Sequence, residues 1–175
     1  MKKVLVLSAS PLDQEPLRLD EEARDLDEKL RLVSKPTVEV SVVNRWAVRT
    51  DQVQEAILNE KPNILHFSGH GGGGSLCFED SAGYSTPVSA TAIAELMRLN
   101  SDYIECLVLN ACYSQEVAEL SSVHLEAVVG CDGSIDDDAA VAFARSFYRA
   151  IADGRTYKVA FDWAVNEVRL NCSDA

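Results

Sequence analysis

Two apolar runs decide the fold of this chain, His66-Phe67-Ser68-Gly69-His70-Gly71 and Val108-Leu109-Asn110-Ala111-Cys112-Tyr113-Ser114, and each stops at a reactive side chain. Continuous apolar runs are typical of parallel strands that are covered on both faces of a sheet. In open α/β sheets, reactive groups gather beyond the carboxyl ends of the strands, along one edge. If the two runs are neighbouring strands, the imidazole of His70 and the thiol of Cys112 meet at that edge.

The rest of the chain alternates between further strand-like and helix-like segments. Apolar runs at 3–8, 38–43, 63–67, 105–110 and 126–130 predict five strands. Helical spacing of apolar residues falls between them, in segments near 19–33, 50–60, 89–100, 136–153 and 157–170. Strands that alternate with helices form a parallel sheet with helices on both faces. We therefore predict an α/β fold, a three-layer α/β/α sandwich with a mostly parallel central sheet.

Several local features follow from the same patterns. The many charges of the first helix are expected on a solvated outer face. The glycine run at 71–74 predicts a flexible loop, followed by a small hairpin near 75–83. Thr50 or Asp51 is expected to cap the second helix. Apolar residues expected to turn inward from the second and last helices include Val53, Ala56, Ile57, Leu58, Ala160, Phe161, Ala164 and Val168.

Composition excludes several classes of partner. The 175 residues, 47% of them hydrophobic, suffice for one core, so residues 1–175 are expected to form a single domain. A net charge of -12 repels phosphate and argues against nucleic acid and anionic membranes. No run approaches the ~20 apolar residues of a membrane span, and no signal peptide is evident, so a cytoplasmic location is expected. Five cysteines without CxxC pairs argue against disulfides and structural zinc, and we expect neither metal nor cofactor.

The two reactive residues suggest nucleophilic chemistry. A cysteine attacks as its thiolate, and a neighbouring imidazole can take the proton of the thiol. The backbone N–H groups of Gly71 and Cys112 stand at strand exits, where two such donors could form an oxyanion hole.

Ser68-Gly69-His70-Gly71 and Leu109-Asn110-Ala111-Cys112-Tyr113-Ser114 resemble the His and Cys motifs of the bacterial CHAT-domain family. This family comprises caspase-like cysteine peptidases related to caspases, metacaspases and separases. Stretches at 17–22, 45–49, 61–62 and 129–130 extend the resemblance over nearly the whole chain. It implies a caspase-like fold, with His70 as general base and Cys112 as nucleophile in the hydrolysis of a protein substrate, and it implies no third catalytic acid.

The resemblance also bears on specificity and regulation. The residue two positions before the nucleophile lines the primary specificity pocket of caspases and metacaspases. Here it is Asn110, neutral where metacaspases carry an acid. Asp132 could add a carboxylate to that pocket, although it could equally cap a turn, and we slightly favour a basic or polar substrate residue. Members of the family are often controlled by fused or partner sensor domains, which implies an activating sensor, a signalling or defence role, and a chain cut from a longer protein.

Three other hypotheses remain open from the sequence. Ser8-Ala9-Ser10-Pro11 resembles the phosphate loop of flavodoxin-like flavin reductases, although neither it nor the glycine run fits G-x-G-x-x-G or the P-loop. His66, His70 and Cys112 could hold a metal if His66 pointed to the exit edge. Finally, the chain could be a catalytically idle caspase-like module kept for docking.

Overall fold

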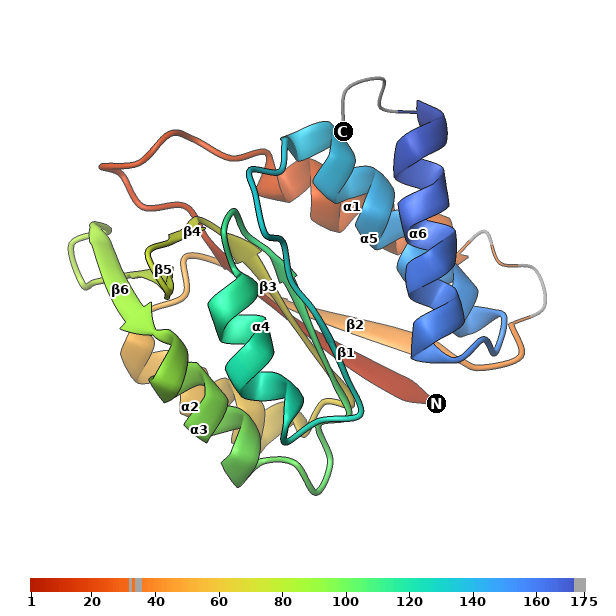
Figure 1. Ribbon diagram of the computed structural model, residues 1–175, viewed down its shortest axis with the longest axis horizontal. Coiled ribbons are helices and arrows are strands. Elements are labelled where there is room, and N and C mark those ends of the chain that lie inside the picture. The colour runs from red at the N-terminus through yellow and green to blue at the C-terminus, as the bar shows by residue number, and fades with distance from the viewer. Residues whose placement is uncertain (32, 34–35, 172–175) are drawn as a thin grey trace.

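The protein is built around a five-stranded parallel sheet (Figure 1). The computed structural model describes residues 1–31, 33 and 36–171. In spatial order the strands are β2 (Val40–Arg45), β1 (Lys2–Ala9), β3 (Ile64–Gly69), β7 (Cys106–Asn110) and β8 (Ala127–Val129). Every pairing within this sheet is parallel. All residues of β3 and β7 are buried, as the two continuous apolar runs predict.

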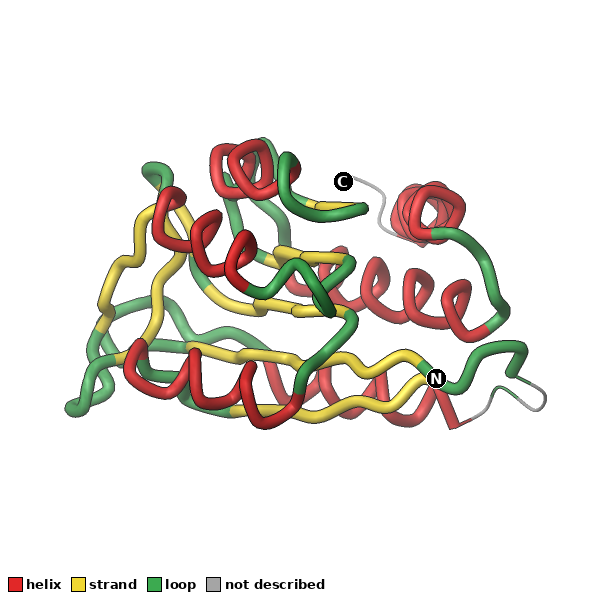
Figure 2. Tube along the Cα trace, turned by 90° about the horizontal axis from the view of Figure 1, so that it is seen from below, coloured by secondary structure: helices red, strands yellow, loops and turns green. Residues whose placement is uncertain are grey.

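Helices cover both faces of this sheet (Figures 1 and 2). One face carries α1 (Leu19–Arg31), α5 (Asp137–Ala152) and α6 (Tyr157–Asn171). The other carries α2 (Thr50–Glu60), α3 (Ala90–Leu99) and α4 (Gln115–Ser122). The predicted three-layer α/β/α sandwich with a parallel central sheet is therefore confirmed.

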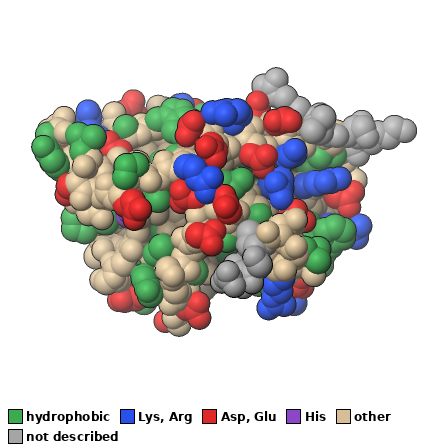
Figure 3. Space-filling model, turned by 90° about the horizontal axis from the view of Figure 1, so that it is seen from above, with side chains coloured by type: hydrophobic (Ala, Val, Ile, Leu, Met, Phe, Trp, Pro, Cys, Tyr) green, Lys and Arg blue, Asp and Glu red, His purple; other side chains and the backbone are tan. Residues whose placement is uncertain are grey.

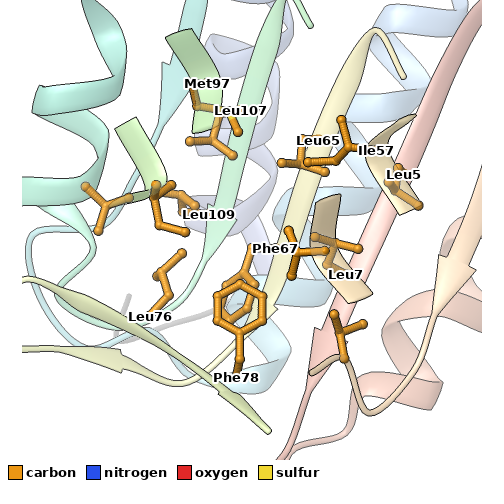
Figure 4. Packing of buried hydrophobic residues seen from close by; sticks show 14 of the residues in the cluster. Leu5, Leu7, Ile57, Leu65, Phe67, Leu76, Phe78, Met97, Leu107 and Leu109 are labelled. Atoms are coloured by element: carbon orange, nitrogen blue, oxygen red, sulfur yellow. The ribbon is translucent and has the colours of Figure 1, made fainter. Parts of the chain in front are cut away.

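Side chains of the central strands alternate between two apolar cores, because successive strand residues point to opposite faces. Leu7 and Phe67 face α2, α3 and α4 (Figure 4), whereas Val6 and Ile64 face α1, α5 and α6. Burying one such side chain contributes roughly 1.5–3 kcal/mol. A slip of one residue would turn every side chain to the wrong core, so this pattern fixes the register of the strands. The carboxyl ends of β3 and β7 are thereby held level.

The glycine run belongs to a second, smaller sheet, so the prediction of a flexible loop is wrong there. β4 (Gly71–Gly72) pairs with β5 (Ser75–Glu79), which pairs with β6 (Ser85–Ser89), all antiparallel. Gly73 and Gly74, with φ of +56° and +71°, form the tight turn between β4 and β5. Only glycine adopts such left-handed conformations freely, and consecutive ones suit a two-residue hairpin turn. The run is thus explained by hairpin geometry.

Some expectations for the helices are wrong. The N-cap position of α2 is Arg49 instead of Thr50 or Asp51, with the Arg49 N–H donating to the Gln52 side chain at 3.3 Å, and Leu58 is 61% exposed. Val53, Ala56 and Ile57 already fill the buried face of α2, and Leu58 lies about 100° further round the helix. Phe161 of α6 is 39% exposed for the same reason, next to the buried Ala160. α4 has no counterpart in the predictions, because it buries few residues and its apolar stripe is short.

Charged side chains of both signs are interspersed on the face of the molecule shown in Figure 3. Arg18 pairs with Glu21 of α1 and with Asp137 and Asp138 at the start of α5. Over the residues that the structure describes, no helix is long and apolar enough to cross a membrane.

Candidate active site

β3 and β7 bring the two predicted catalytic residues to one edge of the sheet. The strands pair with Ser68 opposite Asn110, and His70 and Cys112 each follow two residues later. A Cβ atom added to Gly71 would lie only 2.6 Å from the carbonyl oxygen of Cys112. Glycine therefore allows the backbone after the histidine to touch the backbone of the cysteine. His70 and Cys112 also line one small cavity of about 40 Å³, which has room for a few water molecules.

The imidazole of His70 is oriented by a backbone carbonyl from the segment between β1 and α1. Its Nε2 atom lies 2.7 Å from the carbonyl oxygen of Glu15. A carbonyl oxygen can only accept a hydrogen bond, so Nε2 carries the hydrogen and Nδ1 keeps its lone pair. The ring is thereby fixed in the tautomer whose Nδ1 can accept a proton.

The thiol of Cys112 is held by the loop that follows β8. The Ile135 N–H donates to Sγ at 3.4 Å, and Sγ lies 3.7 Å from the carbonyl oxygen of the same residue. The thiol therefore has one hydrogen-bond donor and one acceptor, both from the backbone of Ile135. Tyr113 adopts a left-handed φ of +51°, and its N–H donates to the Gly133 carbonyl at 2.8 Å. A non-glycine residue in this region is often found at functional turns.

No hydrogen bond joins His70 to Cys112 in the described part of the chain, and each side chain instead bonds to a backbone group of a distant segment, His70 to Glu15 and Cys112 to Ile135. The sequence therefore placed both residues correctly at one edge, while their partners come from elsewhere. A backbone carbonyl such as that of Glu15 leaves no trace in a sequence motif.

A buried carboxylate lies beneath the strand exits, where the sequence predicted only a solvated helix face. Glu22 of α1 is 7% exposed. It accepts hydrogen bonds from Ser68 Oγ and, at 2.6 Å, from Asn110 Nδ2. His66 Nε2 lies 3.2 Å from Glu22 Oε1, within ion-pair distance but outside good hydrogen-bond geometry. The burial of Glu22 could have been recognised from helical spacing, since Glu22 lies four residues before the buried Leu26 and therefore on the apolar side of α1.

The charge state of Glu22 follows from these neighbours. Burial alone raises the pKa of a carboxyl, since it disfavours the charged form. Here the neighbouring His66 and the two hydrogen bonds outweigh burial, and the pKa of Glu22 is lowered. Glu22 is therefore an anion at neutral pH, surrounded by donors.

Asn110 and Asp132, the two predicted pocket residues, line a common groove of about 490 Å³. Its walls come from α5, α6, the end of β8 and the loop after it, with Phe143 and Phe161 among its apolar side chains. Asn110 and Ile135 also line the small cavity at His70 and Cys112, so the groove and the cavity share a wall. The Asn110 amide is itself occupied, because it donates to Glu22 and, at 3.3 Å, to the Ala140 carbonyl.

The groups on which the phosphate-binding and metal-binding hypotheses rest form hydrogen bonds within the protein. The Ser10 N–H, which a phosphate would need, donates to a carboxylate oxygen of Glu79 at 3.0 Å. His66 is fully buried and bonds through Nδ1 to the Tyr148 hydroxyl at 2.8 Å, away from the exit edge. Among the described residues, no group of three or more His, Cys, Asp or Glu side chains is arranged to hold a metal ion.

Comparisons with known proteins agree with this architecture. A family model of the CHAT domain matches residues 2–175. The chain is also similar to a Roc-COR-CHAT protease of an unknown prokaryotic organism, with 23% identity over 175 residues. That alignment covers 96% of this chain but only 16% of the relative. Because the family match includes both strand exits and all the segments around the cavity, the chain belongs to the CHAT domain family.

Proposed function

We propose that this chain is a cysteine endopeptidase domain that hydrolyses a peptide bond of a protein substrate through a dyad of His70 and Cys112. The observation that supports it most is the contact between the two strand exits, where Gly71 meets the Cys112 carbonyl so closely that no Cβ fits. Membership of the CHAT domain family and the protease named among its relatives agree with this activity.

In the proposed reaction, Nδ1 of His70 takes the thiol proton of Cys112, while the Glu15 carbonyl stabilises the Nε2–H of the imidazolium. The thiolate adds to the scissile carbonyl carbon. The imidazolium then gives its proton to the departing amine, which leaves an acyl thioester on Cys112. Water, deprotonated by the same imidazole, hydrolyses the thioester and restores the thiol.

Gly71 and Cys112 supply the oxyanion hole in this proposal. The Cys77 N–H donates to the His70 carbonyl, so Gly71 and Leu76 form a non-hydrogen-bonded pair. In such a pair the N–H group points away from the partner strand. The Gly71 N–H is therefore directed away from β5, and together with the Cys112 N–H it can stabilise the oxyanion of the tetrahedral intermediate.

The groove beside Asn110 and Asp132 is the proposed binding site for the substrate side chain next to the scissile bond. Phe143 and Phe161 offer it apolar contacts, and Asp132 and Asp136 lie in the loop that lines it. Asp136 caps α5 and Arg169 of α6 also lines the groove, so the preference for a basic or polar substrate residue rests on the carboxylate of Asp132.

Regulation by a sensor is the last part of the proposal. The similar Roc-COR-CHAT protease is far longer than this chain, and its name gives Roc and COR beside CHAT. We expect a cytoplasmic role in signalling or defence, in which a fused or separate sensor activates the site.

A thiol-reactive activity probe tests the dyad. Labelling should be lost in Cys112→Ala and weakened in His70→Ala, and a screen for proteins cleaved by wild type but not by Cys112→Ala would identify the substrate. Equal labelling of wild type and both variants would reject the peptidase. It would favour a catalytically idle docking module, which is consistent with the separate hydrogen bonds of His70 and Cys112 in this structure.

A further inference from the structure

The carboxylate of Glu22 joins the two strands that carry the proposed dyad. One oxygen accepts from Ser68 of β3 and the other from Asn110 of β7. These two residues are opposite each other in the parallel pairing. Each precedes a catalytic residue by two positions, Ser68 before His70 and Asn110 before Cys112. A single side chain from α1 thus bridges the last paired residues before both exits.

The bridge stands where the sheet stops holding the two strands together. Ser68 and Asn110 form the last pair in the ladder between β3 and β7. Beyond them, β3 continues to Gly69, which pairs with β1 and not with β7, whereas β7 ends at Asn110. Past this point no strand pairing joins β3 to β7, and the two exits meet again only where Gly71 touches the Cys112 carbonyl. The side-chain bridge is therefore the nearest lateral restraint to the dyad from this side of the sheet.

The need to fill the space beneath Ser68 and Asn110 does not by itself explain why the side chain at position 22 is a carboxylate. A buried carboxylate is strongly unfavourable unless donors surround it, and an apolar side chain would avoid that cost. An apolar side chain, however, would leave the Ser68 hydroxyl and the Asn110 amide without this acceptor. His66, on the same strand as Ser68, adds a third contact at 3.2 Å. The arrangement uses both oxygens of one group to hold two strands at once.

We propose that Glu22 is a positioning residue that sets the separation of His70 and Cys112 by bridging Ser68 and Asn110. This inference rests on the proposed dyad for its catalytic meaning. Glu22 itself does not react. A glutamine can make the same bridge, because its carbonyl accepts from Asn110 while its amide donates to the Ser68 hydroxyl. Alanine removes the bridge entirely.

The test measures alkylation of Cys112 by iodoacetamide from pH 6 to pH 9, with each cysteine followed separately by mass spectrometry. Glu22→Ala, Glu22→Gln and His70→Ala are compared with wild type. The control for stability is Leu26→Ala, which empties a buried site one turn further along α1 without touching either exit. Displacing reacting groups by about 1 Å can slow a reaction up to a hundredfold, so we expect Glu22→Ala to slow alkylation at pH 6 on the order of tenfold. Glu22→Gln should stay within about threefold of wild type, as should Leu26→Ala.

Hydrogen exchange of the same proteins reports the bridge without relying on the dyad. Amides of residues 69–71 and 111–113 should exchange faster in Glu22→Ala than in Leu26→Ala, and at the wild-type rate in Glu22→Gln. Unchanged exchange at both exits in a folded Glu22→Ala protein would overturn the inference. So would alkylation of Glu22→Ala at the wild-type rate while His70→Ala is slow. If His70→Ala reacts like wild type but exchange rises at both exits, the dyad is rejected and the bridge stands.

Discussion

Replacing Gly71 by alanine tests how closely the two strand exits must approach. A Cβ at this position would lie 2.6 Å from the Cys112 carbonyl oxygen and 3.1 Å from the Ala111 Cβ. Ordinary contacts begin near 3.4 Å, so the backbones must separate by about 0.8 Å. The nearest atom is backbone oxygen, which cannot swing aside as a flexible side chain can. We expect Gly71→Ala to destabilise the fold by about 1–3 kcal/mol, as overpacking in a dense region does.

The neighbouring glycine provides the matched control. A Cβ on Gly72 would meet no atom within 4 Å. Gly72→Ala should therefore change stability by less than about 1 kcal/mol, although it lies in the same short strand. Urea unfolding, followed by tryptophan fluorescence, gives both values. Alkylation of Cys112 should slow in Gly71→Ala alone, because only that variant moves the backbone of the cysteine. Equal stability and equal alkylation in the two variants would show that the contact at Gly71 does not constrain the site.

Two further predictions concern the polar and apolar interior. Burial raises the pKa of Glu22, but His66 and the hydrogen bonds outweigh it, so the folded-state pKa is lowered. The carboxylate then stabilises the fold above its unfolded pKa of about 4.3 and loses this effect as the pH falls through the lower folded value. The difference in unfolding free energy between wild type and Glu22→Gln should shrink below about pH 4.3 in urea titrations, and a constant difference would contradict this. Phe67→Ala should lower the free energy of unfolding by about 3–5 kcal/mol, because the ring is buried against Phe78 with the ring centroids 4.9 Å apart. Leu58→Ala, at an exposed position, should lower it by less than about 0.5 kcal/mol. Similar losses in the two variants would contradict the assignment of Phe67 to the core.

The sequence predicted the sheet well because its strongest patterns are long and unambiguous. The runs at 4–7 and 106–109 are apolar at every position, which is typical of strands buried on both faces. That the two strands are neighbours was only a condition in the sequence analysis, and the structure shows that β3 and β7 pair. Elements with short or weak patterns, such as α4, were not predicted.

The surroundings of the proposed dyad could not be predicted in the same way. The Glu15 carbonyl acts through its backbone, which every residue possesses. Glu22 was hidden in a helix rich in charges, where most acids do lie in solvent, and its burial becomes visible only with Ser68 and Asn110 beside it. Both partners come from segments distant in the sequence, so the contact depends on the tertiary fold.

The position of His70 between two sheets has a consequence for the entropy of catalysis. It follows β3 directly and precedes β4 directly, and its carbonyl accepts a hydrogen bond from Cys77 of β5. Ordering the backbone of one residue costs roughly 1–2 kcal/mol, and at His70 the folding of both sheets has already met this cost. In the proposed reaction, a substrate that reaches this edge would therefore encounter a base whose backbone is preorganised, despite the four glycines that follow it.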